Sequence, residues 1–97
     1  MDYKIFWTEE AIQNLDEIID YLATKWTQRE VDNFKEKLSK QIDLIKKYPR
    51  MFPASTFQPR LRKAVLSKQT SIFYEIGDHV IYLAYIFVNY KNTERLK

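Results

Sequence analysis

The chain of 97 residues has a formal net charge of +3 and contains no Cys, one His and one Gly. These scarcities exclude disulfides, thiol nucleophiles, metal sites built on two histidines and glycine-rich phosphate loops. With 45% hydrophobic residues, the length suits one globular domain spanning residues 1–97.

The first quarter of the sequence predicts a strand followed by a helix. Residues 3–7 are aromatic and β-branched, which is typical of a strand. Thr8 is a suitable helix N-cap, and two glutamates follow it where carboxylates favour the helix dipole. Apolar residues then recur at spacings of three and four, which predicts one buried helix face made of Ile12, Leu15, Ile18, Ile19 and Leu22.

A second helix is predicted to begin at residue 28. Thr27 and Glu30 match a capping box, and Trp26 and Val31 stand where a hydrophobic staple would close it. The apolar face continues through Val31, Phe34, Leu38, Ile42 and Ile45. Pro49 ends the helix, and the short connection between the helices predicts an antiparallel helical hairpin.

The remaining sequence predicts a loop and three strands. Residues 49–60 hold all three prolines and two phenylalanines, which are expected to tuck beneath the loop. Strands are expected at residues 61–68, 70–76 and 80–88, separated by turns at Ser67–Thr70 and Gly77–Asp78. Because residues 80–88 are apolar throughout, the last strand should be central and covered on both faces.

The predicted element order is therefore β-α-α-β-β-β. We expect an α+β fold in which the helical hairpin packs on a small, mostly antiparallel four-stranded sheet. The longest apolar run has nine residues, far fewer than the roughly 20 of a membrane helix, and the first residues do not resemble a signal peptide. The sequence thus predicts a cytoplasmic protein with no membrane contact.

Three segments resemble the RelE/ParE superfamily of bacterial toxins in order and spacing. The first is residues 11–22 (AIQNLDEIIDYL), the second is residues 61–65 (LRKAV), and the third consists of two consecutive strands, residues 72–76 (IFYEI) and 80–87 (VIYLAYIF). The likeness covers nearly the whole chain and is closer to the plasmid-stabilisation, ParE-like branch, chiefly through the first helix. The resemblance implies the toxin of a type II toxin–antitoxin system, neutralised by a cognate antitoxin and requiring no cofactor.

The resemblance also implies two rival activities. RelE-like members cleave messenger RNA on the ribosome without a metal ion, and ParE-like members bind and inhibit DNA gyrase. At the positions where the nuclease branch has two Arg and a Tyr, this sequence has Ser71, Tyr90 and Leu96, so the expected cation and phenol are missing. We therefore expect a non-enzymatic toxin with no catalytic residues, gyrase being the first candidate target and ribosome-dependent RNA cleavage the alternative.

Charge points to the region that would meet the partner. Residues 1–24 carry one Lys and six acids, a net charge of −5, whereas residues 25–97 carry fifteen basic and seven acidic residues, a net charge of +8. The residues predicted to bind the target or the antitoxin are Arg60, Arg62, Lys63, Lys68, Lys91 and Arg95. The simpler alternative for the first four is that cations on an edge strand prevent sheet-to-sheet pairing.

Other chemically capable side chains have structural explanations that we favour. His79 follows a turn and has no obvious nucleophile beside it. Tyr74, Tyr82 and Tyr85 lie in strands, where aromatic residues ordinarily pack. The carboxylates of the first helix fall on its solvated face.

Overall fold

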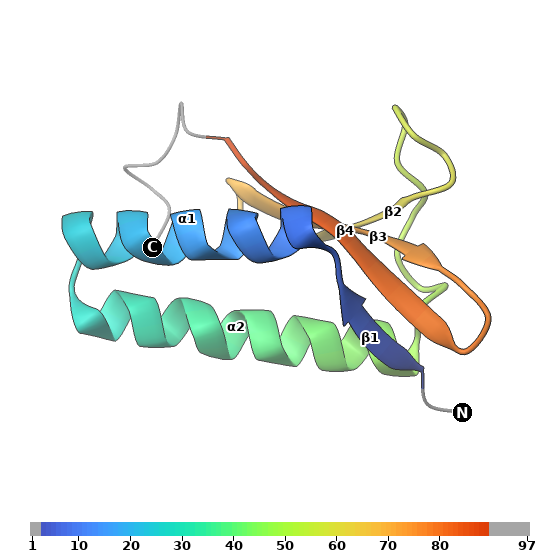
Figure 1. Cartoon of the computed structure of the whole chain (residues 1–97), viewed down its shortest axis with the longest axis horizontal. Helices are drawn as coiled ribbons and strands as arrows, with labels where there is room; N and C mark the ends of the chain where they lie inside the picture. The colour runs from blue at the N-terminus through green and yellow to red at the C-terminus, as the bar shows by residue number, and fades with distance from the viewer. Residues whose placement is uncertain (1–2, 90–97) are drawn as a thin grey trace.

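A computed structural model describes residues 3–89, and its elements follow the predicted β-α-α-β-β-β order. They are β1 (Lys4–Trp7), α1 (Glu9–Lys25), α2 (Gln28–Lys47), β2 (Arg62–Val65), β3 (Thr70–Ile76) and β4 (Val80–Val88). The two helices form an antiparallel hairpin that lies along one face of the sheet (Figure 1). The α+β prediction is confirmed, although β2 is shorter than the expected strand at residues 61–68. No helix in this part of the chain is long and apolar enough to cross a membrane.

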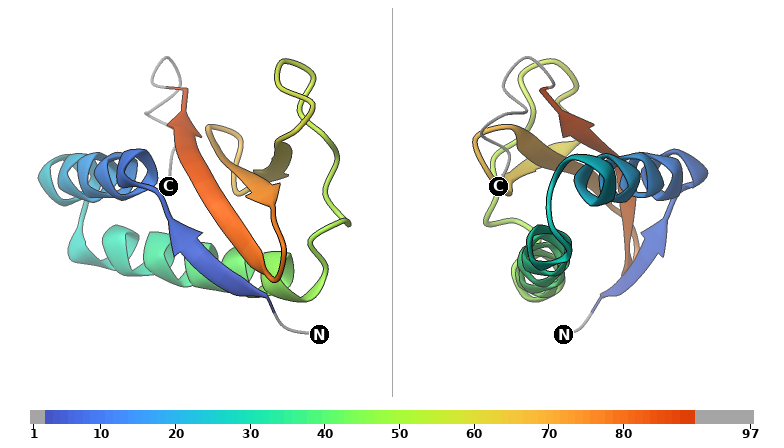
Figure 2. Two further views of the ribbon diagram at one scale, coloured as in Figure 1. Left: turned by 45° about the vertical axis from the view of Figure 1, so that its right-hand side comes forward. Right: turned by 90° about the vertical axis from the view of Figure 1, so that its left-hand side faces the viewer.

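The sheet has the strand order β1-β4-β3-β2. β4 pairs in parallel with β1 and antiparallel with β3, and β3 pairs antiparallel with β2. Figure 2 shows β4 between β1 and β3. The long connection from α2 to β2 lies at the opposite end of the molecule from the turn between the two helices. The predicted central position of β4 is therefore correct.

Side chains at the start of α1 join this helix to β4 where the shorter β1 has ended. The Thr8 hydroxyl accepts a hydrogen bond from the Ala11 backbone N–H at 3.1 Å, as an N-cap does, and lies 2.8 Å from the carbonyl oxygens of Leu83 and Ala84. Six residues later, the Asn14 side-chain oxygen accepts from the Ile86 backbone N–H at 3.0 Å. Thr8 and Asn14 thus contact backbone groups of β4 from Leu83, the last residue paired with β1, onward to Ile86.

The prediction that both faces of β4 are covered was wrong. Ile81, Leu83, Ile86 and Val88 are buried against the helices, whereas Tyr82 is 40% and Phe87 53% exposed. The pairing passes from Phe73–Tyr85 to Tyr74–Leu83 and leaves Ala84 as an extra residue in β4, a β-bulge. This residue shifts the alternation by one, so Ile86 faces the helices as Leu83 does, and Phe87 faces away from them as Tyr82 does.

Two tight turns connect the last three strands. Ser67 and Thr70 exchange backbone hydrogen bonds at 3.1 and 3.3 Å, which confirms the first predicted turn. In the second, the Gly77 N–H donates to the Val80 carbonyl at 2.7 Å, and the residue in the left-handed region is His79, with φ of 64°, rather than Gly77. A Cβ atom at Gly77 would lie 2.8 Å from Tyr82 Cε2, so any larger residue there would require the Tyr82 ring to move.

The core confirms most of the predicted helix faces. Leu22, Val31, Leu38 and Ile45 are buried, but Ile12 is 47% exposed and the neighbouring Ala11 takes its place. The loop aromatics divide in the same way, because Phe52 packs edge-on against Tyr74 with ring centroids 6.3 Å apart, whereas Phe57 is 93% exposed. Only Phe52 tucks beneath the loop as expected.

Tyr74 joins the loop to the centre of the sheet. Its side chain is fully buried, and its hydroxyl donates a hydrogen bond of 2.6 Å to the Pro49 carbonyl. Burial disfavours the phenolate and raises the pKa of Tyr74 to about 12, against the lowering effect of the Arg62 charge. Since the folded state holds this proton more tightly than the unfolded state, the stability it contributes is present below pH 10 and is lost as the pH rises toward 12.

We therefore expect Tyr74→Phe to lower the free energy of unfolding by about 1–3 kcal/mol near neutral pH, because the Pro49 carbonyl loses its buried donor. The difference in the free energy of unfolding between wild type and variant should be smaller by about 1 kcal/mol at a pH near 11. Urea unfolding at both pH values measures it, with Tyr48→Phe as the control at a side chain that is 57% exposed. A difference in free energy that does not change with pH would contradict the conclusion that burial raises the pKa of Tyr74.

Candidate functional site

The basic residues that the sequence singled out do not form one free patch. Arg60 lies in the loop before β2, Arg62 and Lys63 are the first residues of β2, and Lys68 lies in the turn that follows. Lys91 and Arg95 fall outside the described residues. Each of the four cations in the described part of the chain has different surroundings.

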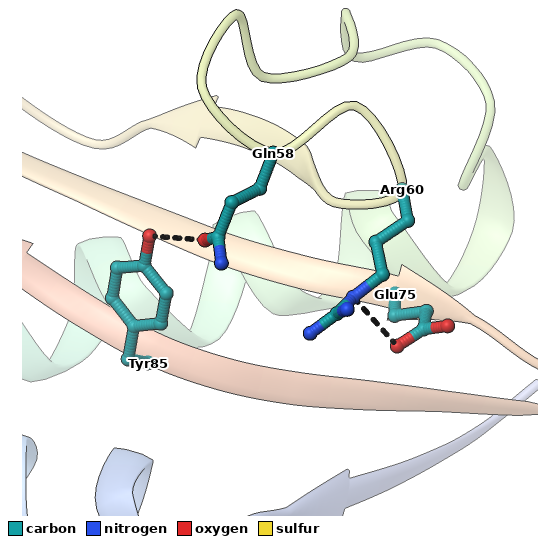
Figure 3. A network of polar contacts seen from close by, with 4 residues as sticks. All are labelled: Gln58, Arg60, Glu75 and Tyr85. Atoms are coloured by element: carbon teal, nitrogen blue, oxygen red, sulfur yellow. Dashed lines mark hydrogen bonds and ion pairs between the residues drawn. The ribbon is translucent and has the colours of Figure 1, made fainter.

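Arg60 faces an acid that is distant in sequence. Its Nε lies 3.9 Å from Oε1 of Glu75 on β3, and both side chains are largely exposed. Two residues earlier, the Gln58 side-chain oxygen accepts a hydrogen bond of 3.1 Å from the Tyr85 hydroxyl. Figure 3 shows both side chains reaching from the loop toward the strands. An exposed pair of this kind contributes little stability, but it places the Arg60 guanidinium over the sheet.

Arg62 has a structural role in the fold, and its predicted contact with a partner stays a prediction. Its Nη1 donates to the Phe52 carbonyl at 2.6 Å and to the Arg50 carbonyl at 3.3 Å. It pairs in the sheet with the buried Tyr74, so the alternation of β2 directs it to the side of the sheet that carries the helices. Its charge therefore fastens the loop to the sheet.

Lys63 and Lys68 are the exposed cations of the hairpin between β2 and β3. The Lys63 backbone N–H donates to the Pro53 carbonyl at 2.9 Å, and the Lys63 side chain is exposed. Neither ammonium group has an ion pair of 4.0 Å or less within residues 3–89. These two lysines retain the charge available to an acidic partner.

The different environments of Arg62 and Lys63 predict different effects on stability. Arg62→Ala should lower the free energy of unfolding by about 1–2 kcal/mol, since it removes a charged donor from partly buried carbonyls. Lys63→Ala should change it by less than about 0.5 kcal/mol, as is usual at the surface. Chemical denaturation of both variants in parallel checks the assignment, and equal losses would refute it.

The remaining candidates agree with structural roles. His79 Nε2 lies 3.4 Å from Asp78 Oδ1 in an exposed turn. Ser71, aligned with a nuclease Arg, is 9% exposed and pairs with Val65 and Phe87, while Tyr90 and Leu96 lie outside the described residues. Residues 3–89 contain no group of three or more His, Asp or Glu placed to hold a metal ion.

Sequence reasoning missed an apolar groove between the helices. Several residues assigned to the core are only partly buried and line an open cleft of about 350 Å³ between α1, α2 and the end of β1. Its lining consists of Trp7, Leu15, Ile19, Lys35, Leu38, Ser39, Ile42 and Asp43. The helical periodicity identified these apolar positions but could not show that no element of residues 3–89 covers them.

Comparison with known proteins gives a consistent picture. The family model described as "ParE toxin of type II toxin-antitoxin system, parDE" matches residues 5–87. No match is found among curated protein sequences.

Solved structures show the same fold at low sequence identity. A chain of the chromosomal ParDE system from P. aeruginosa superposes with a TM-score of 0.75 at 16% identity, covering 89% of this chain and 95% of that one. YafQ from E. coli superposes with a TM-score of 0.62 at 14% identity, covering 92% of this chain and 96% of that one. A chain of the RelBE2 toxin–antitoxin complex from Mycobacterium tuberculosis superposes with a TM-score of 0.56 at 12% identity, covering 92% of this chain and 100% of that one.

Proposed function

The chain belongs to the ParE toxin family of type II toxin–antitoxin systems, and we propose that it arrests bacterial growth by binding a protein target, with DNA gyrase as the first candidate. The observation that carries this proposal is the family match over residues 5–87, nearly all of the described chain. Gyrase and ribosomes are cytoplasmic, so the proposed place of action is the cytoplasm.

The side chains favour binding over RNA cleavage. Cleavage without a metal ion needs a general base, a general acid and cations placed around the phosphorane. Ser71 provides no cation, and Arg62 is engaged by the carbonyls of Phe52 and Arg50. A contact surface requires none of this machinery, and the exposed Lys63 and Lys68 could meet acidic groups of a protein. Lys91 and Arg95 remain predicted contacts.

A cognate antitoxin is the second partner. The similar chains from P. aeruginosa and Mycobacterium tuberculosis come from a ParDE system and a RelBE2 toxin–antitoxin complex, respectively. We propose that the corresponding partner of this chain binds the folded toxin and blocks its access to the target.

Two assays with the purified chain separate the protein-binding activity from RNA cleavage. We expect messenger RNA to stay intact in a translating extract, while DNA supercoiling by purified gyrase is inhibited or cleaved DNA accumulates. Loss of several electrostatic groups, each typically contributing about 10²–10³ in rate, should leave negligible RNA cleavage. Prompt cleavage of message in the ribosomal A site would reverse the assignment in favour of the endoribonuclease.

A further inference from the structure

The face of the sheet opposite the helices carries an aromatic surface that the helical core does not use. Strand register places four aromatic side chains of β3 and β4, together with Phe6 of β1, on this face. We define the aromatic sheet face as Phe6, Phe73, Tyr82, Tyr85 and Phe87. The bulge at Ala84 keeps Tyr82, Tyr85 and Phe87 on the same side despite their unequal spacing.

Pairwise ring contacts hold this surface in place. Phe6 and Tyr82 meet edge-on with centroids 5.7 Å apart, and Phe73 and Tyr85 stack at 4.7 Å with 19° between their planes. Even so, Phe6 and Phe87 are each 53% exposed, and Val65, which pairs with Ser71 on the far side from Phe87, is 57% exposed. Contiguous apolar surface that is ordered yet open to solvent is characteristic of interaction sites.

Charge around the aromatic sheet face identifies its occupant. Lys4 at the β1 edge and Lys63 at the β2 edge share this face, because they pair with Val80 and Phe73. Both are exposed and lack an ion pair within residues 3–89, whereas Glu75 on the same face is matched by Arg60. An apolar centre flanked by unmatched cations complements a protein segment with apolar side chains between acidic ones.

We propose that the aromatic sheet face is the surface that docks an acidic, partly apolar segment of the target protein. This inference rests on the proposed function and adds the contact surface to it. Phe6 with Tyr82 and Phe87 with Val65 supply apolar anchors toward opposite ends of the sheet, and Lys4 and Lys63 supply the charge. The helical hairpin lies on the other side of the sheet and stays free in such a complex (Figure 2).

The test uses the full-length chain in two variants and a control. The double variant Phe6→Gln/Phe87→Gln removes both exposed anchors, and Lys4→Glu/Lys63→Glu reverses the charge while keeping the rings. Leu44→Gln on α2 is the matched control, because Leu44 is a large apolar residue that is 41% exposed on another element. Equal melting temperatures within the set show that the sheet is intact; the charge variant serves where the aromatic variant does not fold.

Inhibition of supercoiling by purified gyrase and growth arrest in cells are the two readouts. We expect each double variant to require about tenfold more protein or more for the same inhibition, as removal of interface anchors commonly does, while Leu44→Gln acts as wild type. Equal potency of folded variants and wild type would overturn the docking surface and leave the toxin function standing.

If the wild-type chain does not inhibit gyrase, that target fails, and the same variants are compared by growth arrest. Arrest by wild type and Leu44→Gln but not by the double variants supports the aromatic sheet face as the docking surface for a different protein. Message cleavage that disappears in the double variants would show that the face holds RNA, which overturns the acidic protein segment as its occupant.

Discussion

Production of this chain without its antitoxin should stop the growth of a bacterial culture and lower viable counts by orders of magnitude. The family match over residues 5–87 motivates this expectation. Co-production of the antitoxin, sought as the small gene beside the toxin gene, should restore growth, because a bound toxin cannot engage its target. Viable counts after induction of the toxin alone and with the antitoxin measure both effects.

The appropriate control is Tyr48→Phe, at a side chain that is 57% exposed, which should arrest growth as the wild-type chain does. Normal growth at a confirmed level of soluble wild-type chain would contradict the toxin function, or leave only a degenerate toxin that has kept the fold.

Binding of the antitoxin should change the stability of the toxin more than the substitutions described above do. A chain of 97 residues has a small core, and a partner that binds only the folded state stabilises it by about 4 kcal/mol when present at about 1,000 times its Kd. The apolar groove between the helices and the aromatic sheet face are surfaces such a partner could cover. For a domain of this size we expect Tm to rise by about 15 °C or more.

Differential scanning calorimetry of the free toxin and of the toxin with saturating antitoxin gives this shift directly. The antitoxin alone provides the baseline, because its own unfolding must not be mistaken for that of the complex. An unchanged Tm at saturation would show that the partner does not discriminate between folded and unfolded toxin.

Local signals in the sequence were sufficient to predict the elements of this fold. Thr8 and Thr27 cap the two helices as their sequence positions indicate, and apolar periodicity identified most of the buried helix residues. The exposure of Ile12 and the left-handed conformation of His79 were not predicted, because small rotations of a helix and the dihedral angles within a turn depend on tertiary packing.

The surfaces were harder to predict than the elements. An uninterrupted apolar run in β4 looks like a strand buried on both faces, and nothing in it marks Ala84 as the bulge that keeps Phe87 on the exposed side with Tyr82. Likewise, the sequence does not distinguish the four neighbouring cations from one another. In the fold, Arg60 lies near the Glu75 carboxylate and Arg62 donates to two backbone carbonyls. Such pairings join residues far apart in sequence and are invisible to local patterns.

The most direct test of a toxin that acts on a protein is a supercoiling reaction to which purified toxin and then purified antitoxin are added. Relaxed plasmid, gyrase and ATP are incubated with increasing toxin, and the topoisomers are resolved by electrophoresis. We predict that supercoiling falls as toxin is added and recovers when antitoxin follows. Full supercoiling at a large molar excess of folded toxin over gyrase would contradict gyrase as the target.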